Sequence, residues 1–152
     1  MVIVGDVKHS RVARSDVDLL GRLGARITLV GPATLMPDDV GSWGIGLTDD
    51  LDSAVSRADV LYMLRVQRER MESGLLPPGG EYSARFGLDA RRAALLSRDA
   101  IVMHPGPMNR GVEMLVDPAD LAGSRILAQV ENGVSVRMAV LFHLMGDGGE
   151  AG

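Results

Sequence analysis

The stretch Met103-His104-Pro105-Gly106-Pro107-Met108-Asn109-Arg110-Gly111 decides the fold that we expect for this chain. It follows the apolar run Ala100-Ile101-Val102-Met103, which predicts a buried parallel strand. Two prolines flank Gly106, so the backbone cannot continue there as a helix or as a sheet ladder. Because ligands in open α/β sheets bind beyond the carboxyl ends of the strands, this turn predicts a binding site.

Further strands and helices alternate along the rest of the chain. Apolar runs predict strands at residues 2–4, 26–30 and 59–64, and helices are expected at residues 10–23, 37–40, 51–57, 89–96, 117–121 and 132–145. Gly24 is expected to cap the first helix, and residues 71–87, rich in Gly and Pro, predict a long surface loop. The fold class is therefore α/β, a doubly wound Rossmann-like three-layer αβα architecture with a mainly parallel sheet.

The composition restricts the classes of function. The 152 residues fit one domain, and 46% of them are hydrophobic, which excludes a disordered chain. A net charge of -4 and a small number of aromatic residues (one Trp, two Tyr, two Phe) argue against a nucleic-acid surface. The absence of cysteine excludes disulfides and thiolate metal sites, and it fits a cytoplasmic protein. We find neither a signal peptide nor an apolar run that could cross a bilayer, so we expect no membrane partner.

The last predicted helix, residues 132–145, is apolar on all sides. Its polar residues are Ser135, Arg137 and His143. A helix that is apolar all round needs burial on more than one side. It is either sandwiched within this domain or packed against a second domain that the chain lacks. We favour the second alternative, because a terminal helix on a small sheet normally keeps one face in water. The chain also begins directly inside a strand, as if an upstream part were missing.

Arginines follow two of the other predicted strands. Arg11 lies in the first turn of a helix, where backbone N–H groups and the helix dipole favour anions. Arg65 and Gln67 follow the strand at residues 59–64 and should share one face. Two guanidinium groups and an amide suit a small dicarboxylate, because Arg binds a carboxylate through two parallel hydrogen bonds.

Plainer roles stay open for each of these residues. Arg11 alone is compatible with a solvated surface position, and Arg65 with an ion pair to Glu69 at the start of a helix. His104 is by type a general acid or a metal ligand. We favour a structural histidine at the strand end, and we expect no metal ion and no cofactor.

Four stretches resemble aspartate carbamoyltransferase in their order and spacing, and the resemblance covers almost the whole chain. They are residues 5–15 (GDVKHSRVARS), 64–70 (LRVQRER), 104–113 (HPGPMNRGVE) and 129–141 (QVENGVSVRMAVL). The resemblance is to the C-terminal, aspartate-binding domain of that family. Residues 1–152 are therefore expected to form this domain, without the carbamoyl phosphate domain.

The resemblance implies an enzyme that transfers the carbamoyl group of carbamoyl phosphate to the amine of L-aspartate. The products are N-carbamoyl-L-aspartate and phosphate, in pyrimidine biosynthesis. It implies that Arg11, Arg65 and Gln67 bind L-aspartate, and that Gly106 and Pro107 bind carbamoyl phosphate. We expect a cis peptide bond before Pro107. The residues expected to support the site are Lys8, Glu69, Arg70, His104 and Pro105, with Arg70 helping to close the loop at residues 71–87.

The same resemblance implies that this half of the enzyme is incomplete. Its partner would be the carbamoyl phosphate domain of the same enzyme, and the full-length family forms a homotrimer. No certain catalytic residue lies in this half, so the chain alone is expected to have little or no activity. Ornithine carbamoyltransferase fits less well, because it should carry a cysteine in the His-Pro turn.

Two other classes of function fit the sequence less well. A non-catalytic aspartate-binding or regulatory module should have a polar face on its terminal helix, which residues 132–145 lack. A nicotinamide-binding Rossmann domain should continue from Gly5 with the Gly-x-x-Gly spacing, and Gly5 is not followed by it after the first predicted strand.

Overall fold

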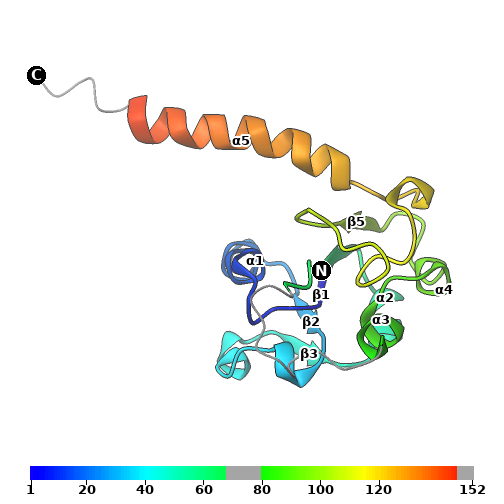
Figure 1. Ribbon diagram of the computed structural model, residues 1–152. Coiled ribbons are helices and arrows are strands. Elements are labelled where there is room, and N and C mark those ends of the chain that lie inside the picture. Colours follow the sequence, from blue (N-terminus) through cyan, green and yellow to red (C-terminus); the bar gives the residue numbers. More distant parts are fainter. Residues whose placement is uncertain (68–79, 147–152) are drawn as a thin grey trace, which may run out of the picture.

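The computed structural model describes residues 1–67 and 80–146, which form a parallel sheet with helices on both faces (Figure 1). In spatial order the strands of the described part are β3 (Gly46–Thr48), β2 (Thr28–Val30), β1 (Val2–Val4), β4 (Val60–Met63) and β5 (Ile101–Met103). All four neighbouring pairs are parallel. The chain winds from β1 outward through β2 and β3, and then in the other direction through β4 and β5. The predicted doubly wound fold is confirmed.

Two buried clusters occupy opposite faces of the sheet. Val4 and Met63 belong to one cluster, whereas the neighbouring strand residues Ile3 and Tyr62 belong to the other. Successive side chains of a strand point to opposite faces, so the sheet is buried on both sides. This arrangement confirms the predicted three layers.

Helices cover both faces. The helix α1 (Arg11–Arg22) packs on one face, and α2 (Leu51–Val55), α3 (Glu81–Phe86) and α4 (Ala90–Ala93) lie on the other (Figure 1). The remaining helical segments of the described chain are the short 3₁₀ turns η1 (Ala33–Leu35), η2 (Val40–Trp43) and η4 (Pro118–Asp120), and the long helix α5 (Ile126–Gly146).

Polar side chains fix the start of three helices. The Ser10 hydroxyl accepts the N–H of Ala13 at 3.1 Å at the start of α1. Asp50 and Asp89 do the same for α2 and α4. Gly24 follows α1 with a φ of 84°, a conformation that favours glycine, which confirms the predicted cap. These caps place Arg11 in the first helical turn after β1, as predicted.

Some predicted boundaries are wrong. The strand β3 was not predicted, because Gly46-Leu47-Thr48 is short and only partly buried. The helix α3 lies inside the segment predicted as a loop, because Tyr82 and Phe86, four residues apart, are both buried. Residues 37–40 form no α-helix: residues 38–39 make a turn, and the 3₁₀ turn η2 begins at Val40.

The last helix starts six residues earlier than predicted, at Ile126 instead of residue 132. Asn132 and Gly133 resemble a helix boundary, but α5 runs through them. A glycine inside a helix costs only about 1 kcal/mol relative to alanine. Anchoring at the start of the helix offsets this cost, because Ile126 is buried and the Gln129 amide donates to the Tyr62 hydroxyl at 2.9 Å.

Beyond this anchor, α5 extends away from the sheet (Figure 1). Its large apolar side chains are exposed. The exposed ones are Leu127, Val130, Val134, Val136, Met138, Val140, Leu141, Phe142, Leu144 and Met145. The alternative in which this helix is sandwiched within the domain is therefore wrong. Within residues 1–67 and 80–146, none of the helices has the length and hydropathy needed to cross a membrane.

Candidate functional site

The carboxyl ends of β1 and β4 mark the point at which the sheet reverses its direction of winding. β1 pairs with β2 on one side and with β4 on the other. Such a switch point is where open α/β sheets bind ligands. A pocket of about 220 Å³ lies beyond these strand ends, lined by Ser10, Arg11, Val12, Arg65, Gln67, Pro105, Gly106 and Pro107. The structure therefore brings the three predicted strand ends together in one pocket.

Asp6 organises the turn that follows β1. Its fully buried carboxylate accepts the His9 backbone N–H at 3.3 Å and contacts His9 Nδ1 at 2.8 Å. Its other oxygen accepts the backbone N–H of Gln67 at 3.3 Å. The Gln67 side-chain amide in turn donates to the His9 carbonyl at 2.9 Å. The turn that leads to Arg11 is thus tied to the segment that carries Gln67.

The segment after β4 alternates between core and pocket. Leu64 and Val66 are buried in the two hydrophobic clusters, whereas Arg65 and Gln67 are half-buried and line the pocket. The prediction that Arg65 and Gln67 share one face is confirmed. Together with Arg11 in the first turn of α1, Arg65 gives this pocket two guanidinium groups and the positive end of a helix dipole.

The turn after β5 contains the predicted cis peptide bond between Gly106 and Pro107. Gly106 has a φ of 64°, which favours a residue without a side chain. His104 is fully buried behind the turn, and its Nδ1 accepts the N–H of Gly106 at 2.9 Å. Its Nε2 lies 3.3 Å from Oε1 of Glu113. His104 faces the interior, as expected for a structural histidine.

The other supporting residues fall in three places. Pro105 lines the pocket. Lys8 is exposed, and its Nζ lies 3.9 Å from Asp38 Oδ1, outside the set of residues that line the pocket. Glu69 and Arg70, and with them the alternative ion pair between Arg65 and Glu69, lie outside the described residues.

Three residues that hold the site together were not predicted as site residues, namely Asp6, Asn109 and Glu113. Asn109 donates from its side chain to the Val66 carbonyl at 2.8 Å, and its backbone N–H donates to Glu113 at 2.5 Å. Asp6 and Glu113 are both fully buried. The available signal was a lone carboxylate next to strongly apolar residues, since charged groups are almost never fully buried unless they are paired.

Tyr82 places a buried, neutral hydroxyl beside Gly5, just after β1. Burial raises the pKa of the Tyr82 phenol well above its ordinary value, and the negative charges of Glu113 and Asp6 raise it further. The hydroxyl also lies close to Gly5, where a Cβ atom would meet it at 2.9 Å. Tyr82 therefore keeps its proton and limits position 5 to glycine.

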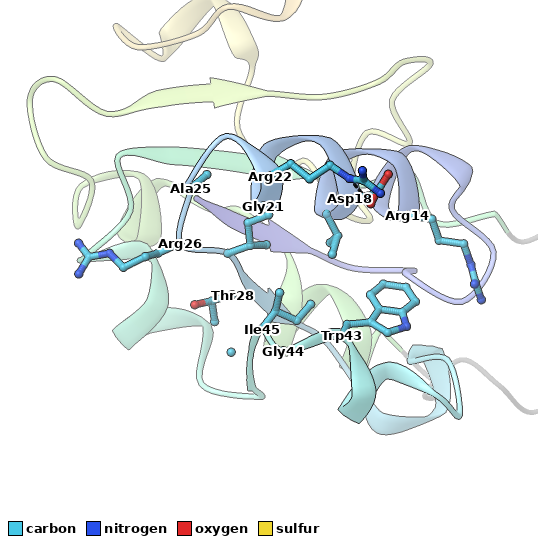
Figure 2. Close-up of a pocket in the computed structure, with 13 residues that line it drawn as sticks. Arg14, Asp18, Gly21, Arg22, Ala25, Arg26, Thr28, Trp43, Gly44 and Ile45 are labelled. Carbon is cyan, nitrogen blue, oxygen red and sulfur yellow. Dashed lines mark hydrogen bonds and ion pairs between the residues drawn. The ribbon is translucent and has the colours of Figure 1, made fainter.

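A larger pocket, of about 870 Å³, lies between α1 and the segment from η2 to β3 (Figure 2). There the Arg14 guanidinium lies 5.2 Å from the centre of the Trp43 ring, and Arg22 donates to Asp18 at 2.9 Å. Figure 2 shows Arg26 directed away from the other labelled side chains. This pocket lies at the amino ends of β2 and β3, whereas ligands in such sheets bind at the carboxyl ends. The smaller pocket is therefore the candidate site.

Known proteins resemble this chain along most of its length. Residues 1–144 match the family model described as aspartate/ornithine carbamoyltransferase, Asp/Orn binding domain. The aspartate carbamoyltransferase catalytic subunit of Beutenbergia cavernae is 58% identical over 149 residues, which are 97% of this chain and 45% of the relative. That of Parafrankia sp. is 55% identical over 149 residues, 98% of this chain and 48% of the relative. The chain thus spans about half the length of these curated relatives.

Solved structures agree with the sequence relatives. Aspartate transcarbamoylase from Trypanosoma cruzi in complex with carbamoyl phosphate has a TM-score of 0.79 at 30% identity, covering 93% of this chain and 48% of that one. Ornithine carbamoyltransferase from Pyrococcus furiosus has a TM-score of 0.76 at 27% identity, covering 95% and 49%. The resemblance found in the four sequence stretches is confirmed. This chain belongs to the aspartate/ornithine carbamoyltransferase family and corresponds to its Asp/Orn binding domain.

Proposed function

We propose that this chain is the aspartate-binding half of an aspartate carbamoyltransferase of pyrimidine biosynthesis. In the reaction, the amine nitrogen of L-aspartate forms a bond to the carbamoyl carbon of carbamoyl phosphate and loses a proton. The bond between that carbon and the phosphate oxygen breaks, which gives N-carbamoyl-L-aspartate and phosphate. The observation that carries the proposal is that Arg11 and Arg65 line one small pocket at the switch point of the sheet.

The two arginines act as a clamp for the two carboxylates of aspartate. A hydrogen bond to a charged group contributes about 1.5–3 kcal/mol, so two such contacts suffice to hold a small dianion. A volume of about 220 Å³ is below the range of pockets for drug-sized ligands, which favours a small metabolite. Gln67 supports the clamp by joining the ends of β1 and β4 through its hydrogen bond to His9.

The turn after β5 binds the carbamoyl group of carbamoyl phosphate. Pro105, Gly106 and Pro107 offer backbone carbonyls and no polar side chains, and a carbamoyl NH₂ or an attacking amine needs such acceptors. His104 supports this turn from behind, and Lys8 adds positive charge at the start of the segment that leads to Arg11. Aspartate transcarbamoylase from Trypanosoma cruzi was solved in complex with carbamoyl phosphate and aspartate, which supports this pairing of ligands.

A second domain completes the enzyme. The curated relatives are about twice as long as this chain, and α5 exposes ten large apolar residues that a carbamoyl phosphate domain would cover. Residues 1–152 are then one domain of two, in an enzyme that forms homotrimers. We expect the enzyme in the cytoplasm, because a chain without cysteines forms no disulfides and needs no oxidising compartment.

The test is the formation of N-carbamoyl-L-aspartate by this chain alone and after mixing with the matching carbamoyl phosphate domain. Isothermal titration of the chain with L-aspartate and with L-ornithine runs in parallel. We expect product only from the mixture, and heat of binding from aspartate only. Binding of aspartate without product in either preparation would replace the proposal with a non-catalytic aspartate-binding module. Preference for ornithine would contradict the assigned substrate.

A further inference from the structure

We infer that Glu113 is a positioning residue of the candidate site. Its Oε1 atom holds the Gly106 turn and the Arg65–Gln67 segment in place relative to each other. Oε1 of Glu113 contacts His104 Nε2 at 3.3 Å and accepts the backbone N–H of Asn109 at 2.5 Å. One arm of this arrangement runs through His104 and the other through Asn109. The kinetic part of the inference rests on the proposed function, whereas its structural part does not.

The first arm fixes the tautomer of His104. The Gly106 N–H can only donate, so Nδ1 of His104, 2.9 Å away, must be unprotonated. The ring proton then lies on Nε2 and points to the Glu113 carboxylate. A neutral imidazole in this tautomer joins Glu113 to the N–H of Gly106. The peptide that lines the pocket at Gly106 is thereby held from inside the protein.

The second arm reaches the arginine side of the pocket. The backbone N–H of Asn109 donates to Glu113, and its side-chain amide donates to the carbonyl of Val66 at 2.8 Å. Val66 lies between Arg65 and Gln67, which both line the pocket. A displacement of Asn109 would therefore move the segment that carries the proposed aspartate ligands.

The backbone of Glu113 is itself held by a hydrogen bond. The Glu113 backbone carbonyl accepts the N–H of Leu88 at 2.9 Å, and both residues are fully buried. Glu113 is thus fixed to the chain segment that follows α3, while its side chain contacts His104 and Asn109. A buried carboxylate is costly unless it is hydrogen-bonded. His104 and Asn109 supply two donors to Oε1 of Glu113, whereas Oε2 has no hydrogen-bond partner among the described residues.

The first experiment records the ring nitrogens of ¹⁵N-labelled histidine in two-bond ¹H–¹⁵N spectra of this chain. Three histidines give three patterns, and His9→Gln and His143→Gln assign them. We expect His104 to carry its proton on Nε2 at neutral pH. His9 is a built-in contrast, because its Nδ1 faces the Asp6 carboxylate and should be protonated. A proton on Nδ1 of His104 would overturn the inference.

The second experiment compares Glu113→Gln with Glu113→Ala in the mixture with the carbamoyl phosphate domain. Glutamine keeps an acceptor at Oε1, so it should retain most of the activity, whereas alanine removes both arms. We expect kcat/KM to fall roughly 100-fold in Glu113→Ala, the order of loss that a misplacement of about 1 Å produces. The fall should come with raised KM values for both substrates. Glu81→Ala, an exposed glutamate of α3, is the matched control.

A third variant separates the two arms and does not depend on the folding of Glu113→Ala. Asn109→Ala removes only the hydrogen bond to Val66, so it should raise the KM for aspartate and leave the KM for carbamoyl phosphate unchanged. Equal changes in both KM values, or equal losses in Glu113→Gln and Glu113→Ala, would contradict the inference. Absence of activity in the unsubstituted mixture would instead contradict the proposed function, and the His104 tautomer would still test the structural part.

Discussion

Asp6 accepts the backbone N–H of Gln67 at 3.3 Å, across 61 positions of the sequence, and so joins the end of β1 to the end of β4. The same buried carboxylate holds His9, three residues further along the chain, through its backbone N–H and its ring. The two segments that carry Arg11 and Arg65 are therefore held in register by a group that does not itself line the pocket.

Asp6→Ala should lower both the stability of the domain and its affinity for L-aspartate. The substitution leaves the N–H groups of His9 and Gln67 without their acceptor, and each unsatisfied buried group costs about 1–3 kcal/mol. Urea denaturation and isothermal titration measure the two effects. Asp6→Asn keeps one acceptor oxygen and should be intermediate. Asp18→Asn, on the exposed face of α1, is the control. Unchanged affinity in Asp6→Ala would show that this link does not position the pocket.

Arg11→Ala and Arg65→Ala should each weaken aspartate binding by on the order of 10- to 100-fold. This range corresponds to the loss of a charge-assisted hydrogen bond of about 1.5–3 kcal/mol. Lysine at either position should recover only part of the affinity, because it keeps the charge and loses the two parallel hydrogen bonds. Titration calorimetry with L-aspartate provides the measurement.

The control for the arginine variants is Arg14→Ala. Arg14 lies one turn further along α1, beside Trp43 in the other pocket, and its loss should leave aspartate binding unchanged. If Arg14→Ala weakened binding as much as Arg11→Ala, the effect would come from net charge and not from the site. The assignment of the smaller pocket would then be wrong.

The sheet and the pocket followed from local patterns, whereas the residues that hold the pocket did not. Short apolar runs placed β1, β4 and β5, and a residue just after a parallel strand must lie at the same edge as its neighbours, which located Arg11 and Arg65. Asp6 and Glu113 take their roles from partners elsewhere in the fold, so their local sequence carries only a weak signal, a lone carboxylate next to apolar residues. The strand β3 and the start of α5 were missed for a similar reason, because tertiary packing overrode weak local preference.

The ion pairs of Asp52 predict how stability depends on pH. Hydrogen bonds from Arg91 and then Arg92 lower the pKa of the Asp52 carboxyl from its ordinary value of 3.8 to about 2. A pKa that is lower in the folded state gives stability that is complete above about pH 4 and is lost as the pH falls toward 2. The contribution links α2 to α4, since Asp52 lies in α2 and both arginines lie in α4.

Asp52→Asn should therefore be less stable than the unsubstituted chain at pH 7, with a difference that shrinks between pH 4 and pH 2. Urea denaturation of both proteins at several pH values measures this difference. The effect should be modest, because the Asp52 side chain is 42% exposed and solvent screens its charge. Asp18→Asn, which removes an exposed pair with Arg22, should show a smaller effect. A difference that does not change with pH would rule out the ion pairs as its source.

Polar substitutions on α5 should weaken association with the carbamoyl phosphate domain and leave the domain itself intact. Leu141 and Phe142 are 57% and 73% exposed, so Leu141→Gln and Phe142→Gln remove apolar surface that nothing in the described domain covers. Surface changes of this kind usually alter stability by less than about 0.5 kcal/mol. The melting temperature should therefore stay nearly constant while sedimentation of the mixture shows less complex. Leu23→Gln, which removes an exposed leucine just after α1, should leave the complex unchanged. If the α5 variants associate as well as the unsubstituted chain, another surface must join the two domains.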